Sequence, residues 1–101
     1  MLRYRGIASD EPERSVFRIV DDDELASSET LDRVARIASI LLQENGLSGT
    51  FGAGEPGELV LALSRTDRSF FHNGIVFAAL DAVNDPVRNP TLTLRADETR
   101  R

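Results

Sequence analysis

An amphipathic segment at residues 28–45 constrains the fold of this chain more than any other feature. Its apolar residues recur at helical spacing on one side, and its charged residues fall on the other. A helix of this kind packs its apolar side on a sheet and keeps its polar side in water. Ser27 or Ser28 is placed to cap the start of this helix, and Gly46 is placed to end it. The apolar side consists of Leu31, Val34, Ala35, Ala38, Leu41 and Leu42.

Several short segments have the composition or the alternation of β-strands. The segment "ELVLALSR" at 58–65 is apolar on both faces, which predicts a central strand. The segment "PTLTLRA" at 90–96 alternates leucine with threonine, which predicts a half-exposed strand. Three further strands are predicted at 2–8, 15–21 and about 48–53.

A second helix is predicted over residues 66–84, halted before Pro86, with a start near Asn73 as the alternative. From residue 15 the predicted order is therefore βαββαβ, the ferredoxin-like arrangement of an antiparallel sheet with two helices on one face. The strand at 2–8 is an extra, fifth strand, which either joins a sheet edge or indicates a different α+β topology. We expect an α+β fold with a four- to five-stranded sheet and a single domain over 1–101, with 96–101 as a frayed tail.

Composition excludes several classes of function. The chain has 101 residues, 12 basic and 17 acidic, giving a net charge of −5, and it contains no cysteine. Disulfides, thiolate metal sites and cysteine nucleophiles are thereby excluded. The acidic balance argues against direct nucleic-acid binding, which depends on neutralising phosphates. With no long apolar run and no apolar leader, we expect a cytoplasmic protein that uses no membrane, metal or cofactor.

A glycine pattern, Gly52-x-Gly54-x-x-Gly57, spells a dinucleotide-binding loop. Such a loop must follow a strand and open a helix, so that the helix N-terminus meets the pyrophosphate. Here the glycines follow a helix and precede a strand. Pro56-Gly57 instead suits the centre of a type II turn, so we predict a hairpin.

The acidic run Asp21, Asp22, Asp23 and Glu24 offers oxygen ligands but lacks the spacing of a calcium loop. We interpret it as a solvated loop whose charges favour the N-terminal end of the following helix. As a functional alternative, the run contacts an arginine-rich partner. A small acidic chain can block a nucleic-acid-binding protein in this way, by presenting carboxylates to its basic groove.

The segment "FFHNGIVFAALD" at 70–81 resembles the helix start of hotdog-fold thioesterases, through His72-x-Gly74 followed by Asp81. The resemblance implies a thioester carbonyl at the helix N-terminus and an acidic residue that acts in hydrolysis. That family also needs several long strands after the helix, and too few residues follow Pro86 to form them. His72 and Asp81 are therefore kept only as ligand or acid–base candidates in a small dimeric enzyme or ligand-binding protein. Arg18 or Arg95 would hold an anionic ligand there.

The second helix is apolar on nearly every side, with Asp81 as its only charge between residues 69 and 83. A helix on one face of a sheet should have a polar outer side, so this one predicts a surface covered by another chain. The hypothesis that follows is a non-enzymatic interaction module, a regulator or inhibitor that binds a protein partner or forms a homodimer. The predicted interface residues are Phe70, Phe71, Ile75, Val76, Phe77 and Ala79.

Overall fold

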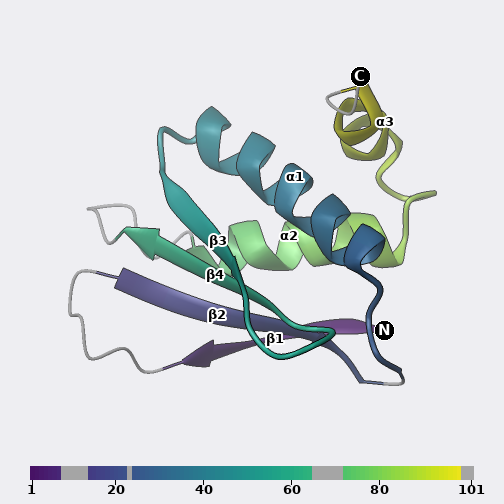
Figure 1. Ribbon diagram of the computed structural model, residues 1–101. Coiled ribbons are helices and arrows are strands. Elements are labelled where there is room, and N and C mark those ends of the chain that lie inside the picture. Colours follow the sequence, from purple (N-terminus) through teal and green to yellow (C-terminus); the bar gives the residue numbers. More distant parts are fainter. Residues whose placement is uncertain (8–13, 23, 65–71, 99–101) are drawn as a thin grey trace.

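The computed structural model describes residues 1–7, 14–22, 24–64 and 72–98. These residues form an α+β fold of two layers, an antiparallel sheet with helices over one face (Figure 1). The elements in chain order are β1 (Leu2–Ile7), β2 (Arg14–Asp21), α1 (Ser28–Glu44), β3 (Gly49–Ala53), β4 (Leu59–Ser64), α2 (His72–Asn84) and α3 (Pro90–Glu98).

The four strands lie in the order β1-β2-β4-β3, and each neighbouring pair is antiparallel. β4 lies between β2 and β3, so the prediction of a central strand from its two apolar faces is confirmed. β1 and β3 are the two edges of this sheet. The edge position of β1 matters for the site described below.

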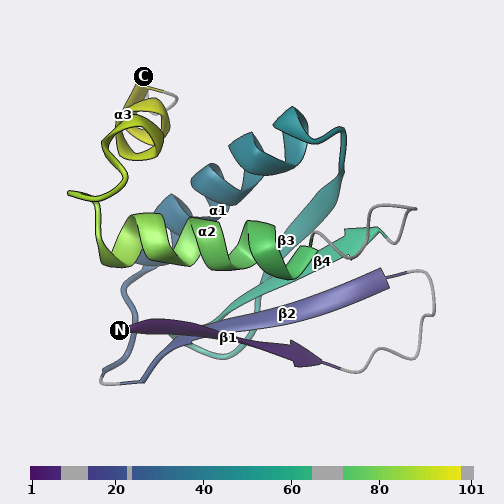
Figure 2. The same cartoon turned by 180° about the vertical axis from the view of Figure 1, so that it is seen from behind.

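The core lies between the inner face of the sheet and the helices. Phe17 and Ile19 of β2 are buried beside Leu61 of β4. These side chains alternate with Val16, Arg18 and Val20 on the other face, as the strand period of two requires. α1 and α2 cover only the inner face, and α3 packs on those two helices (Figure 2). Val34 and Ile37 of α1, and Val76 and Ala79 of α2, complete the buried set.

The ends of α1 follow the capping residues in the sequence. The Ser27 hydroxyl accepts a hydrogen bond from the Thr30 N–H at 3.1 Å, which satisfies one of the donors that a helix start leaves unpaired. At the other end, Gly46 has a φ of 65°. The Leu47 N–H bonds the Leu42 carbonyl at 2.9 Å, which is the Schellman arrangement that glycine favours. Both predicted caps are confirmed.

The glycine pattern lies in the hairpin between β3 and β4, as predicted. The Glu58 N–H donates to the Glu55 carbonyl at 3.0 Å, and Gly57 has a φ of 79°. These are the closing bond and the third-position conformation of a type II turn, with Pro56 in the second position. A helix N-terminus for a pyrophosphate does not follow Gly57, because the next element is β4.

The strand predicted at 90–96 is wrong, because Pro90–Glu98 is helix α3. Leu92 and Ala96, four residues apart, pack on the core, while Leu94 is exposed. The helix begins after Asn89, whose carbonyl accepts from the Thr93 N–H at 3.1 Å. Proline suits the first helical position, because its missing N–H would have no partner there. The Asn89-Pro90 pair thus outweighs the strand-like alternation that follows it.

The βαββαβ order is therefore not formed by the described residues. β1 fills the position next to β2, and it is one of four strands instead of a fifth. In a ferredoxin-like sheet the last strand would lie next to β2, so a hairpin between β1 and β2 would compete with it. With α3 in place of that last strand, β2 has an open side, and β1 pairs there. Residues 96–98, expected in a frayed tail, belong to α3, and residues 99–101 lie outside the described part.

The prediction that α2 exposes an apolar interface is wrong for three of its residues. Ile75, Val76 and Ala79 are buried inside this chain, against the sheet, α1 and α3. With 90–96 predicted as a strand, α3 was missing from the elements that pack against this helix. Phe77 is different, with 63% of its surface exposed. Phe70 and Phe71 lie outside the described residues.

A charged substitution should therefore destabilise the fold much more at Val76 than at its neighbour Phe77. We predict that Val76→Glu lowers the free energy of unfolding by about 4 kcal/mol or more, because it buries an unpaired carboxylate. Phe77→Glu should change it by less than about 1 kcal/mol, because position 77 faces water. Urea unfolding followed by circular dichroism measures both. Equal losses for the two variants would contradict this placement of α2.

Candidate functional site

A groove of about 390 Å³ lies between edge strand β1 and helix α2. We call it the β1–α2 groove. Its volume is within the range of small-molecule and peptide pockets. Its lining comes from the start of β1 and from the second half of α2, namely Met1, Leu2, Arg3, Tyr4, Phe77, Leu80, Asp81 and Asn84.

The walls of the β1–α2 groove are mainly apolar. Leu2 and Leu80 are buried at its base, and Phe77 projects into solvent from α2. The ring of Tyr4 packs edge-to-face on the ring of Phe17, with ring centroids 5.7 Å apart and an interplanar angle of 66°. The groove therefore combines a firmly packed floor with one large aromatic side chain that no described element covers.

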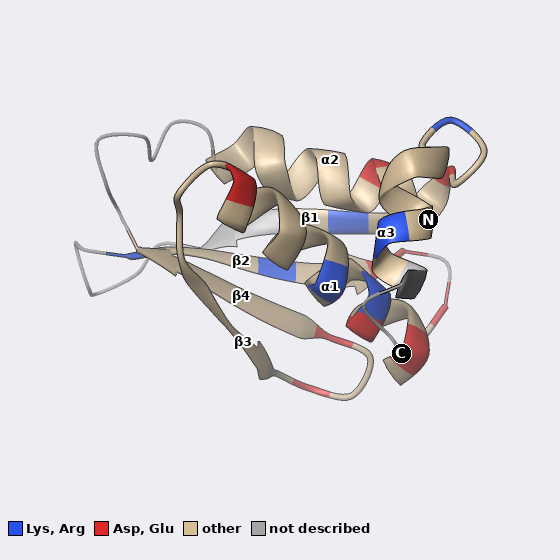
Figure 3. Cartoon of the chain, turned by 90° about the horizontal axis from the view of Figure 1, so that it is seen from above, with Lys and Arg blue, Asp and Glu red and all other residues tan. Residues whose placement is uncertain are grey.

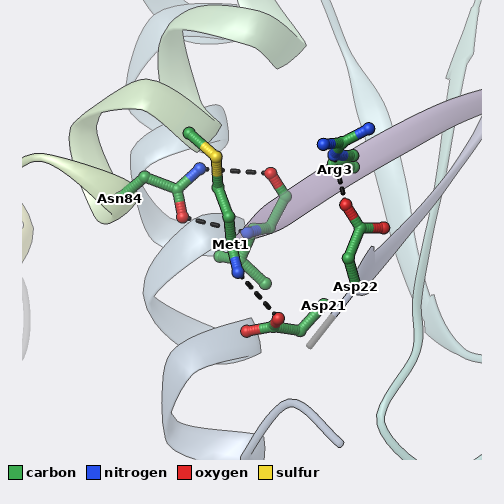
Figure 4. Close-up of polar contacts among 6 residues, drawn as sticks. Met1, Arg3, Asp21, Asp22 and Asn84 are labelled. Carbon is green, nitrogen blue, oxygen red and sulfur yellow. Dashed lines mark hydrogen bonds and ion pairs between the residues drawn. The ribbon is translucent and has the colours of Figure 1, made fainter. Parts of the chain in front are cut away.

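Asn84, the last residue of α2, joins the helix to β1. The Leu2 N–H donates to Asn84 Oδ1 at 3.0 Å, and Asn84 Nδ2 donates to the Leu2 carbonyl at 3.1 Å. Figure 4 shows the Asn84 amide turned toward the strand. This pair of bonds sets the position of the end of α2 relative to the edge of the sheet.

The acidic run is largely occupied by contacts within the chain. Asp21 accepts from the Met1 amino group at 2.8 Å, and Asp22 pairs with Arg3 (Figure 4). Glu24 is exposed, and Asp23 lies outside the described residues. Two of the four predicted contact residues therefore already have a cationic partner, which leaves less negative charge for a basic protein.

His72 and Asp81 do not form one site. They lie at opposite parts of α2, nine residues apart, which is about 13 Å along a helix. His72 is buried, with 1% of its surface exposed, whereas Asp81 lines the β1–α2 groove and accepts from Asn89 Nδ2 at 3.1 Å. The two arginines expected to hold an anionic ligand each pair with an acidic residue of the chain, Arg18 with Glu58 and Arg95 with Glu44.

The described part of the chain shows neither a metal-ion site nor a membrane-spanning helix. It contains no group of three histidine, cysteine or acidic side chains placed to hold a metal ion. None of the described helices is long and apolar enough to cross a membrane. Figure 3 shows acidic and basic residues interspersed over the strands, α1 and the loops, while α2 is nearly free of charge.

The sequence singled out Phe77 as an interface residue and Asp81 as an acid–base candidate, but it did not join them with Tyr4, Leu80 and Asn84 in one groove. Leu80 and Asn84 share the helix face of Phe77, since they follow it at spacings of three and seven residues. That signal was present. The pairing of this face with Leu2 and Tyr4 was not visible in the sequence, because it depends on β1 lying at the edge beneath α2.

Comparison with known proteins adds no family to this description. No family model matches the chain, and no curated protein or solved structure matches it either.

We predict that Asn84→Ala lowers the free energy of unfolding by about 1–3 kcal/mol, since it leaves the Leu2 main-chain groups without their partner. Asn73→Ala, at an exposed position of the same helix, serves as the matched control and should change it by less than about 0.5 kcal/mol. Thermal unfolding of the three proteins gives the comparison. A loss of stability for Asn84→Ala no larger than that of the control would argue against a stabilising contact between Asn84 and Leu2.

Proposed function

We propose that this protein is a non-enzymatic interaction module that binds another protein through the β1–α2 groove. The observation that carries the proposal is Phe77, a large aromatic side chain mostly exposed beside an apolar groove at a sheet edge. Aromatic residues are enriched among the residues that dominate binding energy at protein interfaces. A regulatory or inhibitory role would follow from occupying a partner in this way.

The placement of the polar groups supports a binding role over an enzymatic one. A general acid or base must come within hydrogen-bond distance of its proton, and a nucleophile needs such a group beside it. His72 is buried and outside the groove lining, so it is not an acid–base partner for Asp81 in the groove wall. We assign no catalytic role to either residue.

The surface proposed here is smaller than an interface spread over the whole of α2. It keeps Phe77 and adds Tyr4, over a floor of buried Leu2 and Leu80, whereas Ile75, Val76 and Ala79 do not line the groove. The change moves the proposed contact to the side of α2 that faces the edge of the sheet. A partner bound there would touch both layers of the fold.

We predict that a photoreactive benzoylphenylalanine at position 77 cross-links to a second protein in the cells that make this chain. The same group at position 94 should give no such adduct. Leu94 is the matched control, because it is also helical and 61% exposed but lies on α3, outside the lining of the groove. Denaturing gels and mass spectrometry identify the adducts.

The cross-link has an internal check. Asp81→Arg changes the groove wall while leaving position 77 exposed, so it should reduce the adduct formed at 77. An adduct of equal yield at 77 and 94, or none at 77, would count against the β1–α2 groove as a binding surface.

A further inference from the structure

The main chain of β1 presents a hydrogen-bonding edge to the β1–α2 groove. The Met1 carbonyl accepts from the Asp22 N–H at 3.2 Å, so it points toward β2. The Leu2 N–H and carbonyl both point the other way, to Asn84. Main-chain groups alternate along a strand, so those of Tyr4 also point away from β2. They have no partner among the described residues.

Asn84 already binds this edge as a strand would. Its amide donates to one main-chain carbonyl and accepts from the N–H of the same residue, Leu2. A neighbouring strand makes this pair of bonds with every second residue of an antiparallel edge. The next such position is Tyr4, about 7 Å further along. Tyr4 also lines the groove, so the open edge and the apolar lining are parts of one surface.

The position of α2 favours a single extended segment over a second copy of this chain. Seen from above, α2 runs along the outer side of β1, past the edge of the sheet (Figure 3). Paired strands are about 4.8 Å apart, whereas packed helices need 8–10 Å between their axes. If the β1 strands of two copies paired edge to edge, their α2 helices would compete for the same space. A lone peptide strand brings no such helix.

The groove lining defines the chemistry of the segment. Alternate side chains of an added strand face α2, where Phe77, Leu80 and Tyr4 offer an apolar contact. Asp81 supplies a carboxylate in the same wall, while Arg3, also in the lining, already pairs with Asp22. A residue two positions from the apolar one faces the same side, so a lysine or arginine there would meet Asp81.

We propose that the β1–α2 groove binds an extended peptide segment of a partner protein as an added strand on β1. The segment pairs its main chain with Tyr4, places an apolar side chain against Phe77, and places a basic side chain near Asp81. This inference rests on the proposed function and specifies the form in which the partner binds.

The first test selects peptides from a phage-displayed library of random nine-residue sequences on the immobilised protein. Selected peptides should share an apolar and a basic residue two positions apart. In fluorescence anisotropy of the synthetic peptides, Phe77→Ala should weaken binding about tenfold or more, and Leu94→Ala less than twofold. Asp81→Asn should weaken the basic peptides more than their versions with glutamine in place of the basic residue.

N-methylation of each peptide bond in turn then separates strand addition from other modes. For an added strand, methylation should abolish binding at the residue whose N–H donates to the Tyr4 carbonyl and be tolerated at the residues on either side of it. A periodicity of three to four would mean a helical ligand and would overturn the inference.

Two further outcomes would also overturn the inference. Failure to enrich any peptide would exclude strand addition, while the cross-link at position 77 separately decides the proposed function. Light scattering across a dilution series should show a monomer. A dimer that Phe77→Arg dissociates and Leu94→Arg does not would assign the groove to a second copy.

Discussion

The burial of one face of β4 is the interaction on which the rest of the structure depends. Leu59, Leu61 and Leu63 lie inward from the centre of the sheet, and each fully buried leucine stabilises the fold by about 1.5–3 kcal/mol. A register shift of one residue would turn all three outward, so their burial fixes the pairing with β2 and β3. β1 then takes its register from β2. The edge that faces the groove is therefore positioned from the centre of the sheet outward.

The helix layer explains why a groove forms at one edge. α1 is buried along Leu31, Val34 and Ile37 and packs against both of the other helices. α2 lies to the side of it, along β1, and α3 packs on α1 and α2. Because α2 extends past β1, the space below it has a helix above and a strand beside it, and none of the described strands lies on its outer side. The arrangement that completes the core thus leaves this space open at the edge.

Local signals in the sequence predicted the parts of the fold that depend on local chemistry. The caps of α1, the Pro56-Gly57 turn and the central position of β4 all follow from nearby residues. The helix over 90–96 did not follow from nearby residues in this way, because the leucine–threonine alternation indicates a strand and Asn89-Pro90 indicates a helix start. Because 90–96 was predicted as a strand, α2 was predicted to lack a covering helix, and its buried residues Ile75, Val76 and Ala79 were predicted as an interface. The apolar surroundings of Phe77 could be read from the sequence, but the contact of Asn84 with Leu2 could not, since no local pattern records a contact between a helix end and a sheet edge.

The contact between Asn84 and Leu2 joins positions 82 residues apart. Closing so long a loop costs conformational entropy, which the packing of the rest of the chain must offset for this contact to be stable. Local opening of a native protein releases its weakest and most exposed contacts first. When the amide of Asn84 lets go of the strand, the start of β1 and the end of α2 separate, and both walls of the groove move. The shape of the groove therefore depends on the contact between Asn84 and Leu2, and a ligand that bound only the closed form would stabilise that contact.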